Sequence, residues 1–341
     1  MTARPVTARP ATARPATTRP ARPAVDPELA ALLDGMPDLP ALSAESLLLI
    51  RPYAVGRPAT VLAGRAVRRR ETEVAAADGT SLPLTVRSPA EQDATQDAAP
   101  SGPGAPAVLW LHGGGMVMGD RFSQLDIPLE WLDALGSVVV TVDYRLAPEV
   151  TGTTIVEDGY RALVWLADHA AELGVDPDRV VVAGTSAGGG LAAGVVLLAR
   201  DRGGPAVAAQ VLVCPMLDHR SATTSARQFT GPGVWSLESN RFAWSAVLGA
   251  QPADVPASVS PSVAADLAGL PAAYLDAGSA EVFRDEVVDY ASRIWAAGGQ
   301  AELHVWAGGF HGFDALFPDA AVSRAARASR LGWLRRVLRE G

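Results

Sequence analysis

The chain has 341 residues, no lysine and a formal net charge of −8. Without lysine, a P-loop that ends in Gly-Lys and any lysine Schiff-base chemistry are excluded. Because five arginines and no acidic residue fall in residues 1–25, the remainder carries a net charge of −13, which argues against nucleic-acid binding.

Residues 1–25 repeat an Ala/Thr-Arg-Pro pattern. Proline at this frequency blocks both helix and sheet, so we expect a disordered tail that acts as a passive solvated arm. The segment lacks the apolar core of a secretory signal, and we therefore expect a cytoplasmic protein. Asp26–Ile50 mixes apolar side chains with Pro37 and Pro40, and this segment predicts one or two short helices.

From residue 61 onward, apolar strands alternate with helices. Strands are predicted at Arg68–Val74, Leu82–Arg87, Ala107–Leu111, Val138–Asp143, Val180–Ala183, Ala208–Cys214, Ala272–Asp276 and Glu302–Trp306. Helices are predicted at Ile155–Leu173, Ala187–Arg200, Arg284–Ala297 and Ala320–Arg339. The first two strands have no helix between them and should pair antiparallel. The rest predicts an α/β fold, a mostly parallel sheet covered by helices on both faces.

A His-Gly-Gly-Gly loop, His112–Gly115, follows the third predicted strand. Bare glycine backbone can come within hydrogen-bond distance of a substrate carbonyl oxygen, as in the oxyanion-binding loop of lipases and esterases. We therefore predict that Gly113 and Gly114 supply oxyanion-hole N–H groups and that His112 anchors the loop. A flexible turn is the alternative.

The uncharged stretch Val180–Ala199 joins an apolar strand to an apolar helix through a tight turn with Ser186 at its centre. Gly184 and Gly188 flank Ser186 in the Gly-x-Ser-x-Gly pattern of a nucleophile elbow. A membrane helix is the alternative, but the many glycines make a poor helix interior. Ser186 is the predicted nucleophile. The N–H of Ala187, at the helix N-terminus, is the third predicted oxyanion donor.

Two later loops supply candidates for the base and the acid. His311 lies in a glycine-bounded loop after the last strand. This is the place where a fold with a nucleophile elbow brings its base to the serine. The acid must lie near the end of the preceding strand, and a loop position just past the strand tip is favoured. The candidates are Asp276, Glu281, Asp285 and Glu286.

Together these motifs resemble the hormone-sensitive-lipase family of α/β-hydrolases, the bacterial family IV esterases. The matching segments are HGGG at 112–115, DYRLAPE at 143–149, DPDRVVVAGTSAGG at 176–189, CPMLD at 214–218, FRDE at 283–286 and FHGF at 310–313.

The resemblance implies an α/β-hydrolase domain formed by residues 61–216 and 267–341, with a helical cap formed by residues 26–60 and 217–266. Glu281 occupies the position where the family usually carries aspartate at the start of an acidic run, so it is the implied triad acid. Thr185 resembles the GTSAGG subgroup. After Glu149 the usual Phe-Pro-Ala segment is replaced by VTGTTIV at 150–156.

The cap insertion carries several aromatic residues in a Pro/Gly-punctuated, helix-forming stretch. Some of these aromatics are expected to line an acyl pocket, and the alternative is that they only pack the cap onto the core. The predicted pocket residues are Met116, Trp235, Phe242 and Trp244.

We therefore predict a serine carboxylesterase that hydrolyses short- to medium-chain acyl esters through Ser186, His311 and Glu281. An amidase or acyltransferase would use the same triad. A non-catalytic receptor would lack the histidine that is present here. The single cysteine, Cys214, predicts a buried inert thiol, and no four-ligand metal spacing occurs. We expect a small ester as partner, no metal or other cofactor and no membrane span; a homodimer is left open.

Overall fold

The computed structural model describes residues 20–37, 40–90, 104–250 and 253–338. Within these ranges one eight-stranded sheet has the order β1-β2-β4-β3-β5-β6-β7-β8. All eight predicted strands are present with shifted ends, and the largest shift is at β5, which begins at Val175 and not at the predicted Val180. Their bounds are β1 Val67–Ala75, β2 Ser81–Pro89, β3 Ala105–Leu111, β4 Val138–Val142, β5 Val175–Thr185, β6 Ala209–Val213, β7 Ala272–Gly278 and β8 Ala301–Trp306.

The strand directions follow from the connections between the strands. The turn through Gly79 joins β1 directly to β2, and this pair is antiparallel, as predicted. Strand β2 is also antiparallel to β4, whereas all the remaining neighbours are parallel. The carboxyl ends of β3, β5, β6, β7 and β8 therefore meet at one edge of the sheet, where α/β proteins place their ligand sites.

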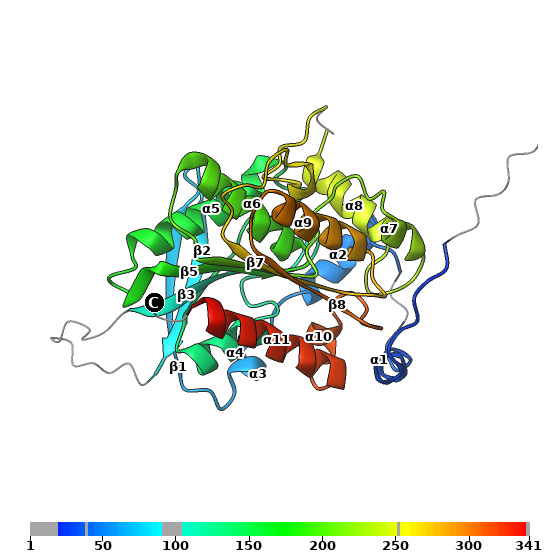
Figure 1. The fold of residues 1–341 in the computed structure, drawn as a ribbon, viewed down its shortest axis with the longest axis horizontal. Coiled ribbons are helices and arrows are strands. Elements are labelled where there is room, and N and C mark those ends of the chain that lie inside the picture. The colour runs from blue at the N-terminus through cyan, green and yellow to red at the C-terminus, as the bar shows by residue number, and fades with distance from the viewer. Residues whose placement is uncertain (1–19, 38–39, 91–103, 251–252, 339–341) are drawn as a thin grey trace, which may run out of the picture.

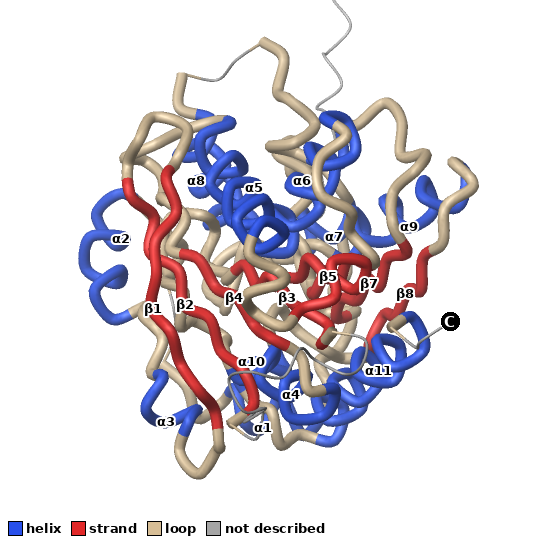
Figure 2. The backbone as a smooth tube through the Cα atoms, turned by 90° about the vertical axis from the view of Figure 1, so that its left-hand side faces the viewer, coloured by secondary structure: helices blue, strands red, loops and turns tan. Residues whose placement is uncertain are grey.

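Helices cover both faces of the sheet (Figures 1 and 2). On one face lie α5 (Thr153–Asp168), α6 (Ala187–Arg202) and α9 (Arg284–Ala296), and on the other lie α4 (Asp126–Leu135) and α11 (Ala321–Val337). The sequence analysis missed α4, which begins at Asp126; its N-cap residue, Leu125, offers no side-chain cap, so the helix carries no start signal.

The central strands are buried on both faces and are correspondingly rich in valine. Every residue of β4 is buried, which is the pattern expected of strands sandwiched between helices. The stretch Val180–Ala199 forms part of β5 and most of α6, so it is not one continuous helix. Nowhere in the described ranges is a helix both long and apolar enough to cross a bilayer.

Short helices lie in the chain before β1 and again between β6 and β7. The first group consists of α1 (Pro27–Leu33), α2 (Ala44–Ile50), η1 (Arg51–Tyr53) and α3 (Pro58–Leu62). The second consists of α7 (Thr224–Gln228), α8 (Leu237–Leu248) and η2 (Pro261–Val263), and α10 (Phe313–Leu316) follows β8.

Residues 20–25 form hydrogen bonds with the end of α7 and the residues after it. The Arg22 side chain donates through Nε to the carbonyl of Gln228 at 2.6 Å and through Nη2 to that of Thr230, and the Gln228 amide donates to the Ala21 carbonyl. The expected disordered, passive tail is therefore wrong for residues 20–25; its remainder, residues 1–19, lies outside the described residues. The prolines do exclude helix and strand here, but they leave carbonyls and guanidinium groups free to bond.

Candidate active site

The turn between β5 and α6 brings the Ser186 hydroxyl to the carboxyl edge of the sheet. Ser186 has φ 56° and ψ −121°, a strained backbone conformation for a residue with a side chain. A methyl group on Gly188 would lie 2.0 Å from the carbonyl oxygen of Leu111, and one on Gly184 would lie 2.3 Å from that of Gly188. Glycine is therefore required on both sides because backbone packs directly on backbone.

Three of the predicted site residues form one hydrogen-bonded chain. Ser186 Oγ lies 2.9 Å from His311 Nε2, and His311 Nδ1 lies 2.6 Å from Glu281 Oε2. Glu281 Oε1 accepts a 2.7 Å hydrogen bond from the Gly278 N–H. All three side chains are buried, Glu281 at 1% exposure, so their polar atoms interact with little competition from water.

The competing acid candidates have other partners. Asp285 accepts from the backbone N–H of Ser225 and pairs with Arg284. Asp276 bonds to Arg330 and Trp306. Glu286 accepts from two backbone N–H groups of the segment after β6. Of the four candidates, Glu281 alone bonds to His311 in the described structure.

Close backbone packing joins the loop of Glu281 to the loop of His311. A methyl group on Gly278 would meet the carbonyl oxygen of Gly309 at 2.0 Å. The Ala280 N–H donates to the same carbonyl at 2.9 Å. The two loops, 30 residues apart in sequence, are therefore held in one position relative to each other.

A buried ion network lies behind the His311 loop. Arg330 on α11 donates through Nε to Asp276 at 2.8 Å and through Nη1 to Asp314, and each of the three side chains is at most 2% exposed. Because Asp314 is three residues after His311, this network ties the histidine loop to β7 and α11. The sequence analysis considered Asp276 as an acid and did not identify this role.

The glycine loop is fixed by two side chains. The Gly113 N–H donates to Gln124 Oε1 at 2.9 Å, and His112 Nδ1 lies 2.8 Å from the Gly113 carbonyl oxygen. His112 is buried and stacks on Tyr144, as its predicted anchoring role requires. Because its N–H is already engaged, Gly113 does not present a free donor here, contrary to the prediction. Gln124 was missed because nothing in the sequence links it to Gly113.

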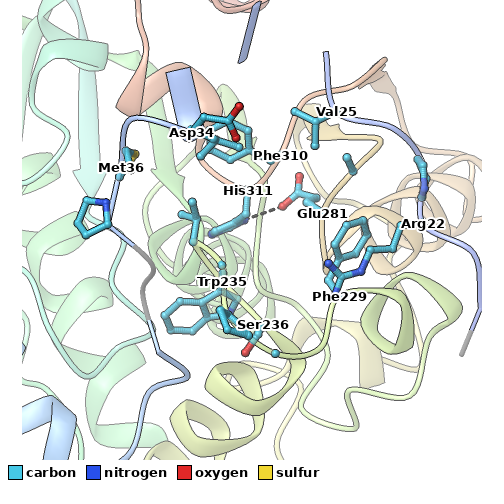
Figure 3. Close-up of a pocket in the computed structure, with 18 residues that line it drawn as sticks. Arg22, Val25, Asp34, Met36, Phe229, Trp235, Ser236, Glu281, Phe310 and His311 are labelled. Atoms are coloured by element: carbon cyan, nitrogen blue, oxygen red, sulfur yellow. Dashed lines mark hydrogen bonds and ion pairs between the residues drawn. The ribbon is translucent and has the colours of Figure 1, made fainter. Parts of the chain in front are cut away.

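A cavity of about 330 Å³ opens beside Glu281 and His311 (Figure 3). Its lining combines three segments: residues 22–37, residues 229–236, and the loops that carry Glu281 and His311. Apolar side chains dominate the wall, whereas Arg22 and Asp34 supply charge. The apolar lining residues include Val25, Leu33, Met36, Phe229, Trp235 and Phe310.

The structure places the four predicted pocket residues in two different settings. Trp235 lines this cavity, and its ring centroid lies 6.2 Å from that of His311. Met116, Phe242 and Trp244 are not among the lining residues. Trp244 is 2% exposed and packs into the core with Met116, and Phe242 packs against the same cluster. The two aromatic side chains, Phe242 and Trp244, are thus placed as the packing alternative expects, with α8 against the core.

The environment of His311 favours its protonated form. Burial by itself lowers the pKa of His311, but Cys214 and Glu281 beside it outweigh that effect and raise the pKa above its usual range. Burial also raises the pKa of the Cys214 thiol. The thiol is buried as predicted, but its position beside His311 was not foreseen.

Comparisons with known proteins show the family of the chain. Residues 108–315 match a protein family that is described as having the alpha/beta hydrolase fold. The chain belongs to that family. The carboxylesterase NlhH of Mycobacterium tuberculosis is 34% identical over 93% of this chain and 98% of its own length. The esterase LipI of the same species is 35% identical over 67% of this chain and 73% of its own.

Solved structures of esterases are similar along nearly the whole chain. A bacterial heroin esterase is 38% identical, with a TM-score of 0.82 over 93% of this chain and 99% of its own. Esterase LipW of Mycobacterium marinum is 32% identical, with a TM-score of 0.81 over 94% of this chain and 99% of its own. The predicted fold and the predicted enzyme class, a carboxylic ester hydrolase, are thereby confirmed, and the resemblance to the hormone-sensitive-lipase family is supported.

Proposed function

We propose that this carboxylic ester hydrolase is a serine esterase that acts on short- to medium-chain acyl esters. The observation that carries the proposal is the continuous hydrogen-bonded chain from Ser186 through His311 to Glu281. A hydroxyl, an imidazole and a carboxylate in this order have the geometry of a nucleophile, its base and the group that orients the base.

In the proposed mechanism, His311 Nε2 accepts the Ser186 proton as Oγ attacks the ester carbonyl carbon. Glu281 holds the proton on Nδ1 and stabilises the imidazolium that forms. His311 then gives its proton to the leaving alcohol, and an acyl-enzyme remains. Water, activated by the same imidazole, attacks the acyl carbon and releases the acid and the free Ser186 hydroxyl.

The proposed oxyanion donors are the N–H groups of Gly114 and Ala187. Ala187 is the first residue of α6, where helix N–H groups have no partner within the helix and the helix dipole favours negative charge. The Gln124 side chain accepts from the Gly113 N–H and so holds the loop at the residue before Gly114. Losing one such donor typically raises the barrier by about 3 kcal/mol.

The size of the cavity supports the substrate class. At about 330 Å³, it lies at the small end of the range for ligand pockets, which runs from roughly 300 to 1,000 Å³. Its apolar wall suits an acyl or alkyl group of modest length. A small-molecule ester is thus the proposed substrate, and a cytoplasmic location remains the expectation from the sequence.

The test is a chain-length series of nitrophenyl esters with the wild type and Ser186→Ala. We expect the highest kcat/KM at short or medium acyl length, and loss of hydrolysis in the variant at every length. Activity that rises into emulsified long-chain triglyceride would contradict the small pocket. Equal turnover of a matched anilide would replace the esterase proposal by an amidase, and faster transfer to an added alcohol than to water would replace it by an acyltransferase.

A further inference from the structure

Cys214 takes no part in the proposed hydrolysis, although it lies among the residues that do. It directly follows β6, has φ 37° and is 4% exposed. One donor atom from each of Cys214, Glu281 and His311 lies within 4.8 Å of the other two. A thiol, a carboxylate and an imidazole therefore converge in one buried place at the carboxyl edge of the sheet.

This donor set has the chemistry of a site for a soft or borderline divalent cation. Thiolate, imidazole and carboxylate are the protein ligands of Zn²⁺, and thiolate disfavours Mg²⁺. A thiolate and a carboxylate would together balance a charge of 2+, while the imidazole stays neutral, so the occupied site would carry no net charge. Charge balance matters here because an unpaired charge is costly in a buried place.

The distances require only small movements. Zn²⁺ bond lengths of about 2.0 to 2.3 Å in tetrahedral geometry put neighbouring donor atoms about 3.4 to 3.6 Å apart. From separations of up to 4.8 Å, the donors would close by about 1 Å. The 2.6 Å contact between Glu281 and Nδ1 would open by a similar amount. Glutamate has one more rotatable bond than aspartate, which gives the carboxylate this freedom.

We propose that Cys214, Glu281 and His311 form an inhibitory binding site for a soft or borderline divalent cation such as Zn²⁺ or Cd²⁺. The ion would enter through the cavity that Glu281 and His311 line, and would bind Sγ, a carboxylate oxygen and Nδ1. The thiol proton leaves to solvent. From the imidazolium, the proton on Nδ1 also leaves to solvent and the one on Nε2 stays; from the neutral imidazole, the proton moves from Nδ1 to Nε2. The imidazole then presents an N–H to Ser186 and can no longer accept the serine proton.

The binding test uses apo Ser186→Ala, which keeps all three donors. Titration with Cd²⁺ should produce the ultraviolet thiolate-to-cadmium charge-transfer band, saturating at one equivalent. Because Cys214 is the single cysteine, the band reports this site alone. It should vanish when Cys214→Ser is added to the same background and persist when His169→Gln is added instead. This readout needs no ester hydrolysis, so its outcome is independent of the proposed function.

The inhibition test compares each protein with its own metal-free rate. Cd²⁺ and Zn²⁺ should inhibit the wild type, Mg²⁺ should not, and EDTA should restore the rate. Cys214→Ser should raise the half-inhibitory concentration more than about tenfold, since losing even an outer partner of a metal ligand costs about 10- to 100-fold in affinity. Should Cys214→Ser fail to fold, Cys214→Ala takes its place.

Two results would overturn the proposal. The first is the absence of a charge-transfer band from Ser186→Ala at stoichiometric Cd²⁺. The second is equal inhibition of the wild type and the Cys214 variant, which would place the inhibitory ion elsewhere. A band without inhibition of the wild type would likewise refute the inhibitory role.

Discussion

Replacing Glu281 by glutamine should move the proton of the neutral His311 imidazole from Nδ1 to Nε2. The Gly278 N–H donates to Oε1 at 2.7 Å, so the glutamine side chain should keep its carbonyl oxygen there. Its NH₂ group would then occupy the position of Oε2, 2.6 Å from Nδ1 in the wild type. A donor at that position favours the tautomer with a bare Nδ1 and an N–H on Nε2, which cannot accept the Ser186 proton.

The expected loss in kcat for Glu281→Gln is about 10⁴-fold, the effect seen when the acid of a serine-protease triad is made an amide. That factor corresponds to about 5.5 kcal/mol in the barrier. The assay is steady-state hydrolysis of a short nitrophenyl ester, with circular dichroism to check the fold. Asp285→Asn is the matched control and should retain its activity. A loss below about tenfold in Glu281→Gln, or an equal loss in Asp285→Asn, would refute the tautomer argument.

Three further predictions concern stability, packing and pH. Arg330→Met should lower the free energy of unfolding by about 3 to 5 kcal/mol in urea titration, because two buried carboxylates lose their cation; a change below 1 kcal/mol would contradict this. Gly188→Ala should abolish hydrolysis or folding, whereas Gly332→Ala, in open space on α11, should leave activity intact and stabilise by up to about 1 kcal/mol. Wild-type kcat/KM should rise with pH, because the pKa of His311 is raised and only neutral imidazole accepts a proton; Glu281→Gln should move the residual rise to lower pH, and an unmoved profile would contradict this.

Most elements of the sheet and its flanking helices could be predicted because they carry their own local signals. Apolar runs such as β4 (Val138–Val142) are long enough to be strands and are bounded by turn residues. The glycines around Ser186 mark a turn that no other residue type can form. Helix α4 has no such signal, since Leu125 at its start is not a capping residue.

The parts that escaped prediction depend on contacts between distant segments. Gln124 bonds to the glycine loop across 11 residues, and Arg22 bonds to Gln228 across 206. Neither contact leaves a periodic pattern in the sequence. The place of Cys214 was predictable in principle, because it follows a strand whose carboxyl end meets those of the strands before Ser186 and Glu281.

The cavity draws most of its wall from stretches of the chain that contribute no member of the hydrogen-bonded chain. Met36 precedes the first strand, and Phe229 and Trp235 belong to the insertion after β6, whereas Ser186 and His311 lie on loops of the sheet. The residues proposed to select the substrate and the residues proposed to cleave it thus lie in separate segments of the chain. A mutant library confined to residues 22–37 and 229–236 can therefore vary the cavity wall, and with it the ester preference, without changing Ser186, Glu281 or His311.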